Sequence, residues 1–76
     1  MDFKTATDRL TACIGHADIA EAAGVSVQSI RQARLDPTNP SYRSPPPGWE
    51  SVLARLARER SRLLKTLADA LERRSP

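Results

Sequence analysis

Proline divides this chain of 76 residues into two parts. Five of its six prolines lie between Asp36 and Gly48, in the sequence DPTNPSYRSPPPG. Proline lacks a backbone N–H and pushes the preceding residue out of the α region, so this stretch excludes a helix and an interior strand. We therefore expect an extended loop, partly polyproline II, between a head at residues 1–35 and a helix at residues 49–74.

The proline-rich loop, residues 36–48, has two competing interpretations. It is either a rigid spacer that sets the angle between the head and the following helix, or a polyproline ligand for an aromatic groove of another protein. Because helices are expected on both sides of the loop, we favour the spacer.

Within the head, residues 16–35 read HADIAEAAGVSVQSIRQARL. Apolar residues recur there at helical spacing, interrupted once, at Gly24. A tight turn between two helices needs a residue that tolerates positive φ, and glycine does so without a Cβ penalty. Ser26 follows and can cap a second helix by accepting a hydrogen bond from a free N–H group. The pattern predicts a helix-turn-helix, with helices over about 16–23 and 27–35.

The first residues of the chain predict an additional short helix. Thr5 or Thr7 is the expected cap, and Gly15 the expected end. The apolar stripe of this helix is predicted to be Ala6, Leu10, Cys13 and Ile14. The three short helices are expected to pack around a small core of Leu10, Ile14, Ile19, Val25 and Ile30.

Residues 49–74 contain neither proline nor glycine and predict one long helix. At 1.5 Å per residue it spans roughly 37 Å, more than a core this small can cover. Its first half, from Trp49 to Ala57, is expected to pack on the head, with Trp49 as the anchor. The second half has four leucines without a place in that core: Leu63, Leu64, Leu67 and Leu71. Because their spacing is close to an a/d alternation, we favour pairing with a second copy over folding back on the same head.

Length and composition support a single all-α domain over residues 1–76. A chain this short buries little apolar surface, so oligomerisation would help its stability. Only three residues are aromatic, which suits helices of alanine and leucine better than an aromatic-rich sheet. The predicted architecture is a helix-turn-helix bundle of three short helices, followed by the proline-rich loop and one long C-terminal helix.

The net charge of +3 is distributed unevenly. Residues 1–24 carry two basic residues against four acidic ones, whereas residues 25–62 carry seven arginines against three acidic residues. The positive charge therefore begins with the second helix of the motif, as expected of a nucleic-acid-binding surface. The simpler alternative is that arginine is a good helix former on a solvated face.

The residue types that carry catalysis and metal binding are scarce. One cysteine, Cys13, and one histidine, His16, cannot supply the three or four ligands of a tetrahedral metal site. We also find no glycine-rich phosphate loop and no evident carboxylate pair, so we expect no enzyme, cofactor, metal or small-molecule substrate. A lone cysteine excludes an internal disulfide, and no signal peptide or membrane span is evident, so we expect a cytoplasmic protein without a membrane partner.

Residues 16–35 resemble the helix-turn-helix of the Cro and repressor proteins of lambda-like phages. The likeness rests on small or apolar residues at five motif positions: Ala20, Gly24, Val25, Ile30 and Ala33. That family often begins the motif with a glutamine that binds backbone phosphate, where this chain has His16. The resemblance implies a transcriptional regulator, such as a repressor, that binds double-stranded DNA sequence-specifically as a homodimer. Such a dimer prefers an inverted repeat, with half-sites about 10 bp or a multiple apart.

The second helix of the motif is expected to enter the major groove. The candidates for contacts to base edges are Val27, Gln28, Arg31 and Gln32. Arginine suits guanine, glutamine suits adenine, and valine can touch a thymine methyl group. The candidates for phosphate contacts, which fix the register without reading sequence, are His16, Ser26, Arg34 and Arg43.

Two other classes of function stay open. An antitoxin or adaptor would use the long helix to bind a partner protein, with the head as a scaffold. An excisionase-like architectural factor would bend DNA rather than regulate a promoter.

Overall fold

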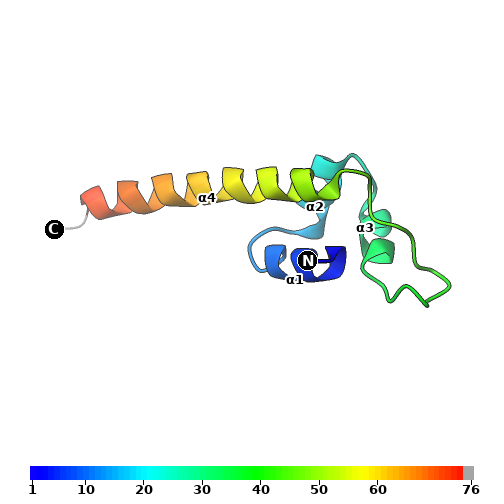
Figure 1. The fold of residues 1–76 in the computed structure, drawn as a ribbon. Helices are drawn as coiled ribbons and strands as arrows, with labels where there is room; N and C mark the ends of the chain where they lie inside the picture. The colour runs from blue at the N-terminus through cyan, green and yellow to red at the C-terminus, as the bar shows by residue number, and fades with distance from the viewer. Residues whose placement is uncertain (75–76) are drawn as a thin grey trace.

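The computed structural model describes residues 1–74, which contain four helices and no strand. The helices are α1 (Phe3–Leu10), α2 (His16–Ala23), α3 (Val27–Ala33) and α4 (Trp49–Arg74). Figure 1 shows the first three gathered into the head, and α4 extending away from it. The predicted all-α fold class is therefore confirmed.

The beginning of α1 differs from the prediction. The carboxylate of Asp2, rather than Thr5 or Thr7, caps the helix and accepts a hydrogen bond from the Thr5 N–H at 2.8 Å. Thr7 is buried, and its hydroxyl donates to the Phe3 carbonyl at 2.8 Å. The prediction was wrong because aspartate and threonine are both good caps, and the spacing of polar residues does not decide between them.

Cys13 lies outside α1, although it was expected on the apolar stripe of that helix. The helix ends at Leu10, and a turn continues from there to Gly15. Helical spacing therefore stops before Cys13, whose side chain is exposed. Ile14, which follows in the same turn, is buried as predicted.

The turn between α2 and α3 has the geometry that the sequence predicts. Gly24 lies in the left-handed region, with φ 71° and ψ 30°, and its N–H bonds back to the Ala20 and Glu21 carbonyls. The Ser26 hydroxyl accepts a hydrogen bond from the Ser29 N–H at 3.1 Å and so caps α3. Together, α2 and α3 form a helix-turn-helix.

The core is small and joins the head to the first turns of α4. Its buried apolar residues are Phe3, Ile14, Ile19, Ala20, Ile30, Ala33 and Leu53. Three of the five predicted core residues are among them, whereas Leu10 and Val25 are only partly buried at its edge. Leu10 closes α1 and Val25 lies in the turn between α2 and α3, so both side chains lie where a helix ends or a turn begins.

The first half of α4 packs on the head, as predicted. Trp49 meets the Phe3 ring edge-to-face, with the ring centroids 5.3 Å apart. Leu53, one turn later, is buried, and Leu56 is partly buried. Burying a leucine side chain contributes about 1.5 to 3 kcal/mol, so these contacts hold α4 in a defined direction against α1 and α2.

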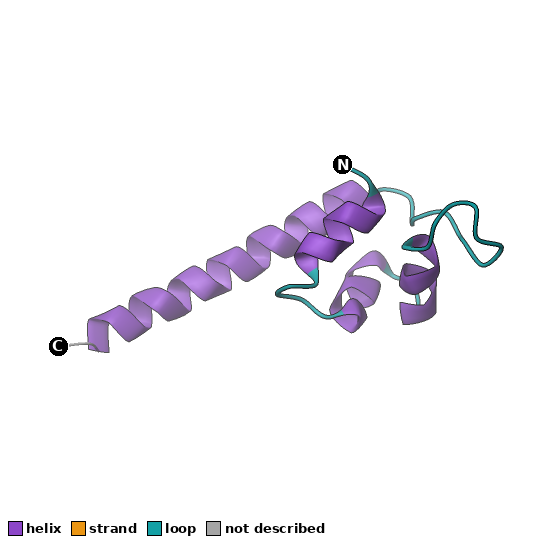
Figure 2. Cartoon of the chain, turned by 90° about the horizontal axis from the view of Figure 1, so that it is seen from below, coloured by secondary structure: helices purple, strands orange, loops and turns teal. Residues whose placement is uncertain are grey.

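The second half of α4 extends beyond the head, as both views show (Figures 1 and 2). Every residue from 61 to 74 is exposed. The leucine face, which we define as Leu63, Leu64, Leu67 and Leu71, has side chains 52% to 64% exposed. The helix therefore does not fold back on its own head.

The proline-rich loop is held against the end of α3. The Arg43 N–H donates to the Gln32 carbonyl at 3.3 Å, and the Trp49 N–H donates to the Pro46 carbonyl at 3.2 Å. Near its start, the Asp36 carboxylate accepts a hydrogen bond from the Thr38 N–H at 2.8 Å. These contacts fix the loop to both helices that it joins, and its role as a spacer stays a prediction.

The left-handed conformation of Gly24 predicts a specific cost of substitution. A Cβ at Gly24 or at Gly15 meets no atom within 4 Å, so the two positions differ in backbone conformation rather than in space. Gly24→Ala should lower the free energy of unfolding by about 1 to 2 kcal/mol, because φ is positive there. Gly15, with φ −74°, provides the control. Gly15→Ala, at the N-cap of α2, should cost less than Gly24→Ala in urea denaturation, because the poorer cap is offset by the lower entropy of the unfolded chain. Equal losses in both variants would contradict this assignment.

Candidate nucleic-acid interface

The candidate base-contacting residues lie together on α3. The inward face of this helix carries Ile30 and Ala33, both buried. Gln28 and Arg31 are exposed on the outward face, with Gln32 half-buried beside them. This separation follows from the helical period, because residues three or four positions apart share a face.

Val27 occupies a less open position than Gln28 and Arg31. It is half-buried at the first turn of α3 and packs against the core. Its backbone position is set by Ser26, which caps the helix immediately before it. A side chain placed in this way contributes mainly to packing and offers only part of its surface to a ligand.

The outward face of α3 is electrostatically simple. Its sequence, VQSIRQA, contains one arginine and no acidic residue. Within the described residues, the Arg31 guanidinium forms no salt bridge, and its side chain is exposed. The face therefore presents hydrogen-bond donors and acceptors from amides, together with one uncompensated positive charge.

Arg34 and His16, two of the candidate phosphate contacts, are joined within the fold. The Arg34 guanidinium donates to His16 Nε2 and also to the carboxylate of Asp8. This arginine comes from the end of α3, the histidine from the start of α2 and the aspartate from α1. The cluster ties the three helices of the head together, so a phosphate would have to compete with Asp8 for the guanidinium.

The other two candidates remain at the surface near α3. The Ser26 hydroxyl is exposed and lies 3.0 Å from the Ser29 hydroxyl at the start of the helix. Arg43 is exposed in the loop, and its backbone bond to Gln32 places it beside the last turn of α3. These two residues therefore flank the outward face of the helix at its two ends.

Sequence reasoning missed Asp8 as a member of this region. Asp8 accepts hydrogen bonds from Arg34 and from the Lys4 ammonium group, the latter at 3.1 Å. Both bonds lower the pKa of the Asp8 carboxyl group, with the larger effect from Arg34. Only the pairing with Lys4, at the i,i+4 spacing of a helix, was detectable from the sequence.

Two kinds of feature, a metal-binding cluster and a membrane-spanning helix, are absent from the described residues. Among residues 1–74, no three histidine, cysteine or acidic side chains are grouped so that they could hold a metal ion. No helix in this part of the chain is long and apolar enough to cross a membrane.

The lowered pKa of Asp8 predicts how acid affects stability. Its ionised form stabilises the fold above the ordinary pKa of 3.8, and this contribution is lost as the pH falls through the lowered value. Asp8→Asn should lower the melting temperature at about pH 5, and should make its further decrease towards about pH 2 smaller than in the wild type. Asp69→Asn, on the exposed half of α4, is the control and should keep the wild-type pH profile. A wild-type profile for Asp8→Asn would argue against the Asp8–Arg34 contact.

Comparisons with known proteins do not assign the chain to a family. No protein-family model, no curated protein and no solved structure matches it. We therefore infer a function from the geometry of the helix-turn-helix that α2, Gly24 and α3 form.

Proposed function

We propose that this chain is a sequence-specific DNA-binding transcriptional regulator that acts as a homodimer, similar to Cro and repressor proteins. The observation that carries the proposal is the outward face of α3, where Gln28 and Arg31 are exposed without an acidic neighbour in the helix. The helix follows a left-handed turn at Gly24 and is capped by Ser26. Such a regulator acts in the cytoplasm, and a single cysteine fits a reducing compartment.

In the proposed complex, α3 lies in the major groove of double-stranded DNA. The Arg31 guanidinium donates two hydrogen bonds to one guanine, and the amides of Gln28 and Gln32 pair with adenine. Val27 contacts a thymine methyl group with the part of its side chain that stays exposed. Ser26 and Arg43, at the two ends of the helix, bind phosphates and fix the register.

The small size of this face supports a homodimer. One short helix with one uncompensated arginine gives a small contact area and little electrostatic attraction to DNA. Two copies related by a two-fold axis double both contributions and select an inverted repeat. The leucine face of α4 provides an uncovered apolar surface through which two copies can associate.

A second candidate function is supported by the same leucines. A protein-interaction module, such as an antitoxin or adaptor, would cover the leucine face with a different protein. Selection of bound sequences from a random DNA pool separates the two functions. An inverted repeat among the selected sequences supports the regulator, whereas no complex at low salt in a gel shift contradicts it. Selected sequences that share a DNA shape but no base-specific repeat would favour an architectural factor.

Arg31 should carry sequence preference. Arg31→Ala is expected to cost about 1 to 3 kcal/mol on the selected site and little on random DNA, because a bidentate contact to guanine is lost. The measurement is a fluorescence-anisotropy titration with both DNAs at the same salt concentration. Arg58→Ala, on the outer surface of α4, is the charge-matched control and should keep the preference. Unchanged site preference in Arg31→Ala would show that another face reads DNA.

The leucine face should control the oligomeric state. Leu67→Glu places a charge at the centre of this face and should convert the dimer to a monomer in light scattering. Helical content should be retained by circular dichroism, because Leu67 contributes nothing to the core of the head. Glu72→Leu, on the opposite side of α4, should leave the dimer intact. A wild-type chain that is monomeric at high concentration would contradict the homodimer.

A further inference from the structure

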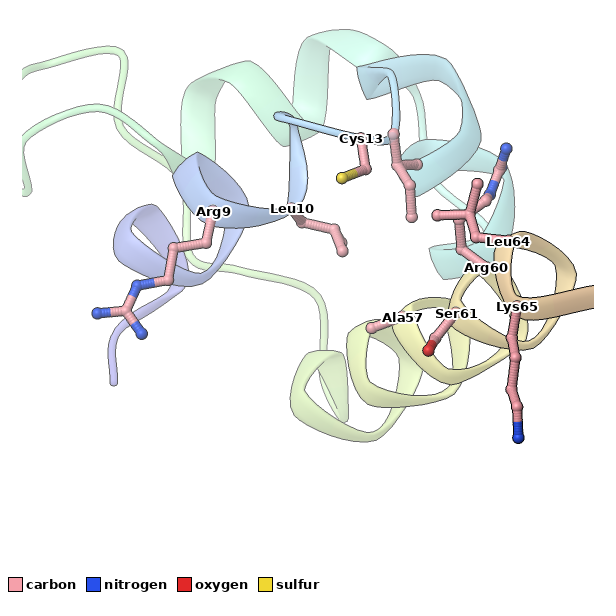
Figure 3. Close-up of a pocket in the computed structure, with 9 residues that line it drawn as sticks. Arg9, Leu10, Cys13, Ala57, Arg60, Ser61, Leu64 and Lys65 are labelled. Carbon is pink, nitrogen blue, oxygen red and sulfur yellow. The ribbon is translucent and has the colours of Figure 1, made fainter. Parts of the chain in front are cut away.

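An apolar groove lies between the head and α4 (Figure 3). Leu10 and Cys13, from the end of α1 and the turn after it, form one side. Ala57 and Leu64, on α4, form the other. The groove is open to solvent and has a volume of about 480 Å³. Leu64 belongs to both the groove and the leucine face, so the two surfaces adjoin.

The groove and the leucine face lie on one continuous stripe of α4. Heptad spacing from Leu53 and Leu56 continues through Arg60 to Leu63 and Leu67. The head covers the beginning of this stripe, where Leu53 is buried, and leaves the remainder exposed. The apolar residues of both halves of α4 therefore lie on the same side of the helix. The head covers those of the first half, and those of the second half are exposed.

We propose that the uncovered half is occupied by the α4 helix of a second copy, which runs antiparallel and inserts its C-terminal leucine into the groove. This arrangement rests on the homodimer of the proposed function and specifies how its two copies are oriented. The two heads then lie at opposite ends of a paired helix. Each copy contributes a groove and receives a leucine from its partner, so the contact is closed by two-fold symmetry.

Arg60 disfavours a parallel pair because of its size. It lies at a seam position of the stripe, so parallel helices in register would place two arginine stems opposite each other where smaller apolar side chains pack better. In each copy the Arg60 guanidinium lies 3.5 Å from the Asp18 carboxylate on α2, which directs its charge towards the head. An antiparallel pair instead places the partner's Ala70 opposite Arg60, which leaves room for the arginine stem.

Charge complementarity and the groove fix the same register. When the pair is centred near residue 65, Leu63 lies opposite the partner's Leu67. At one edge of the pair, Glu59 then lies beside the partner's Arg73, an opposite-charge contact that occurs twice by symmetry. At the other edge, the partner's Leu71 lies beside Ala57, in the groove that Cys13 also lines. One register therefore pairs Glu59 with the partner's Arg73 at one edge and Leu71 with the groove at the other. The stems of Arg9, Arg60 and Lys65 also line the groove.

The exposed native Cys13 makes this arrangement testable by cross-linking. Leu71→Cys in the full chain, treated with a short bismaleimide, should give a covalent dimer that peptide mass spectrometry identifies as a link between Cys13 and position 71. Combining Leu71→Cys with Cys13→Ser should abolish that dimer. In the antiparallel pair the two positions 71 are about 18 Å apart along the axis, beyond a short cross-linker.

A control and two outcomes complete the cross-linking test. Glu72→Cys, one residue further along on the outer surface of α4, should give little covalent dimer. A strong link between two positions 71 in the Cys13→Ser background would show a parallel pair and overturn the proposal. A cross-link between Cys13 and position 72 as strong as that with position 71 would also overturn it, because the groove would then not select Leu71.

A charge exchange tests the register without cysteine chemistry. Glu59→Arg should raise the dimer dissociation constant about tenfold, because it faces the partner's Arg73. Adding Arg73→Glu in the same chain should restore the wild-type value, whereas Glu72→Arg alone should change it little. Failure of the double variant to recover would contradict the register, since only the antiparallel pair brings positions 59 and 73 together.

The outcomes for dimer orientation and for DNA binding are separable. An antiparallel dimer that gives no gel shift at low salt leaves this inference standing and removes the proposed regulator. A parallel dimer that selects an inverted repeat supports the proposed regulator and overturns this inference. A chain that stays monomeric in light scattering contradicts the homodimer, both in the proposed function and in this inference.

Discussion

The packing of α2 against both α3 and α4 holds the molecule together. Ile19 and Ala20 are buried in α2, and Ile30 from α3 and Leu53 from α4 belong to the same core. Ala20 has the smallest side chain among these residues and permits close approach at the helix crossing. The orientation of the outward face of α3 and the direction of α4 depend on one small cluster, so a substitution in this cluster affects both.

Much of the fold could be predicted from the sequence because the residues that determine it act on the backbone close to them in the chain. Gly24 and Ser26 act on the backbone within four residues of themselves, so the helix-turn-helix could be located from the sequence. The second half of α4 was predicted to remain uncovered by the head because its length exceeds what a small core can bury. The errors at Thr5, Thr7 and Cys13 concern helix ends, where several residues are acceptable and periodicity is short.

The candidate site was predictable only in part, for a physical reason. The face of α3 follows from helical periodicity, so the grouping of Gln28 and Arg31 was available from the sequence. The cluster of Asp8, His16 and Arg34 was not, because these residues come from three elements and meet only after the head has packed. The cluster changes the interpretation of Arg34, which stabilises the head through an ion pair and is less available to a ligand than Arg31.

Because α4 is one uninterrupted helix, the direction in which the leucine face points is fixed relative to the head. Each residue inserted between Leu56 and Leu63 would move that face by about 1.5 Å and turn it by about 100° relative to the head. An insertion of about seven residues would restore the direction of the face while lengthening the molecule by roughly 10 Å. The length of this segment is therefore constrained in steps of about one heptad, because other lengths would turn the leucine face away from its direction relative to the head.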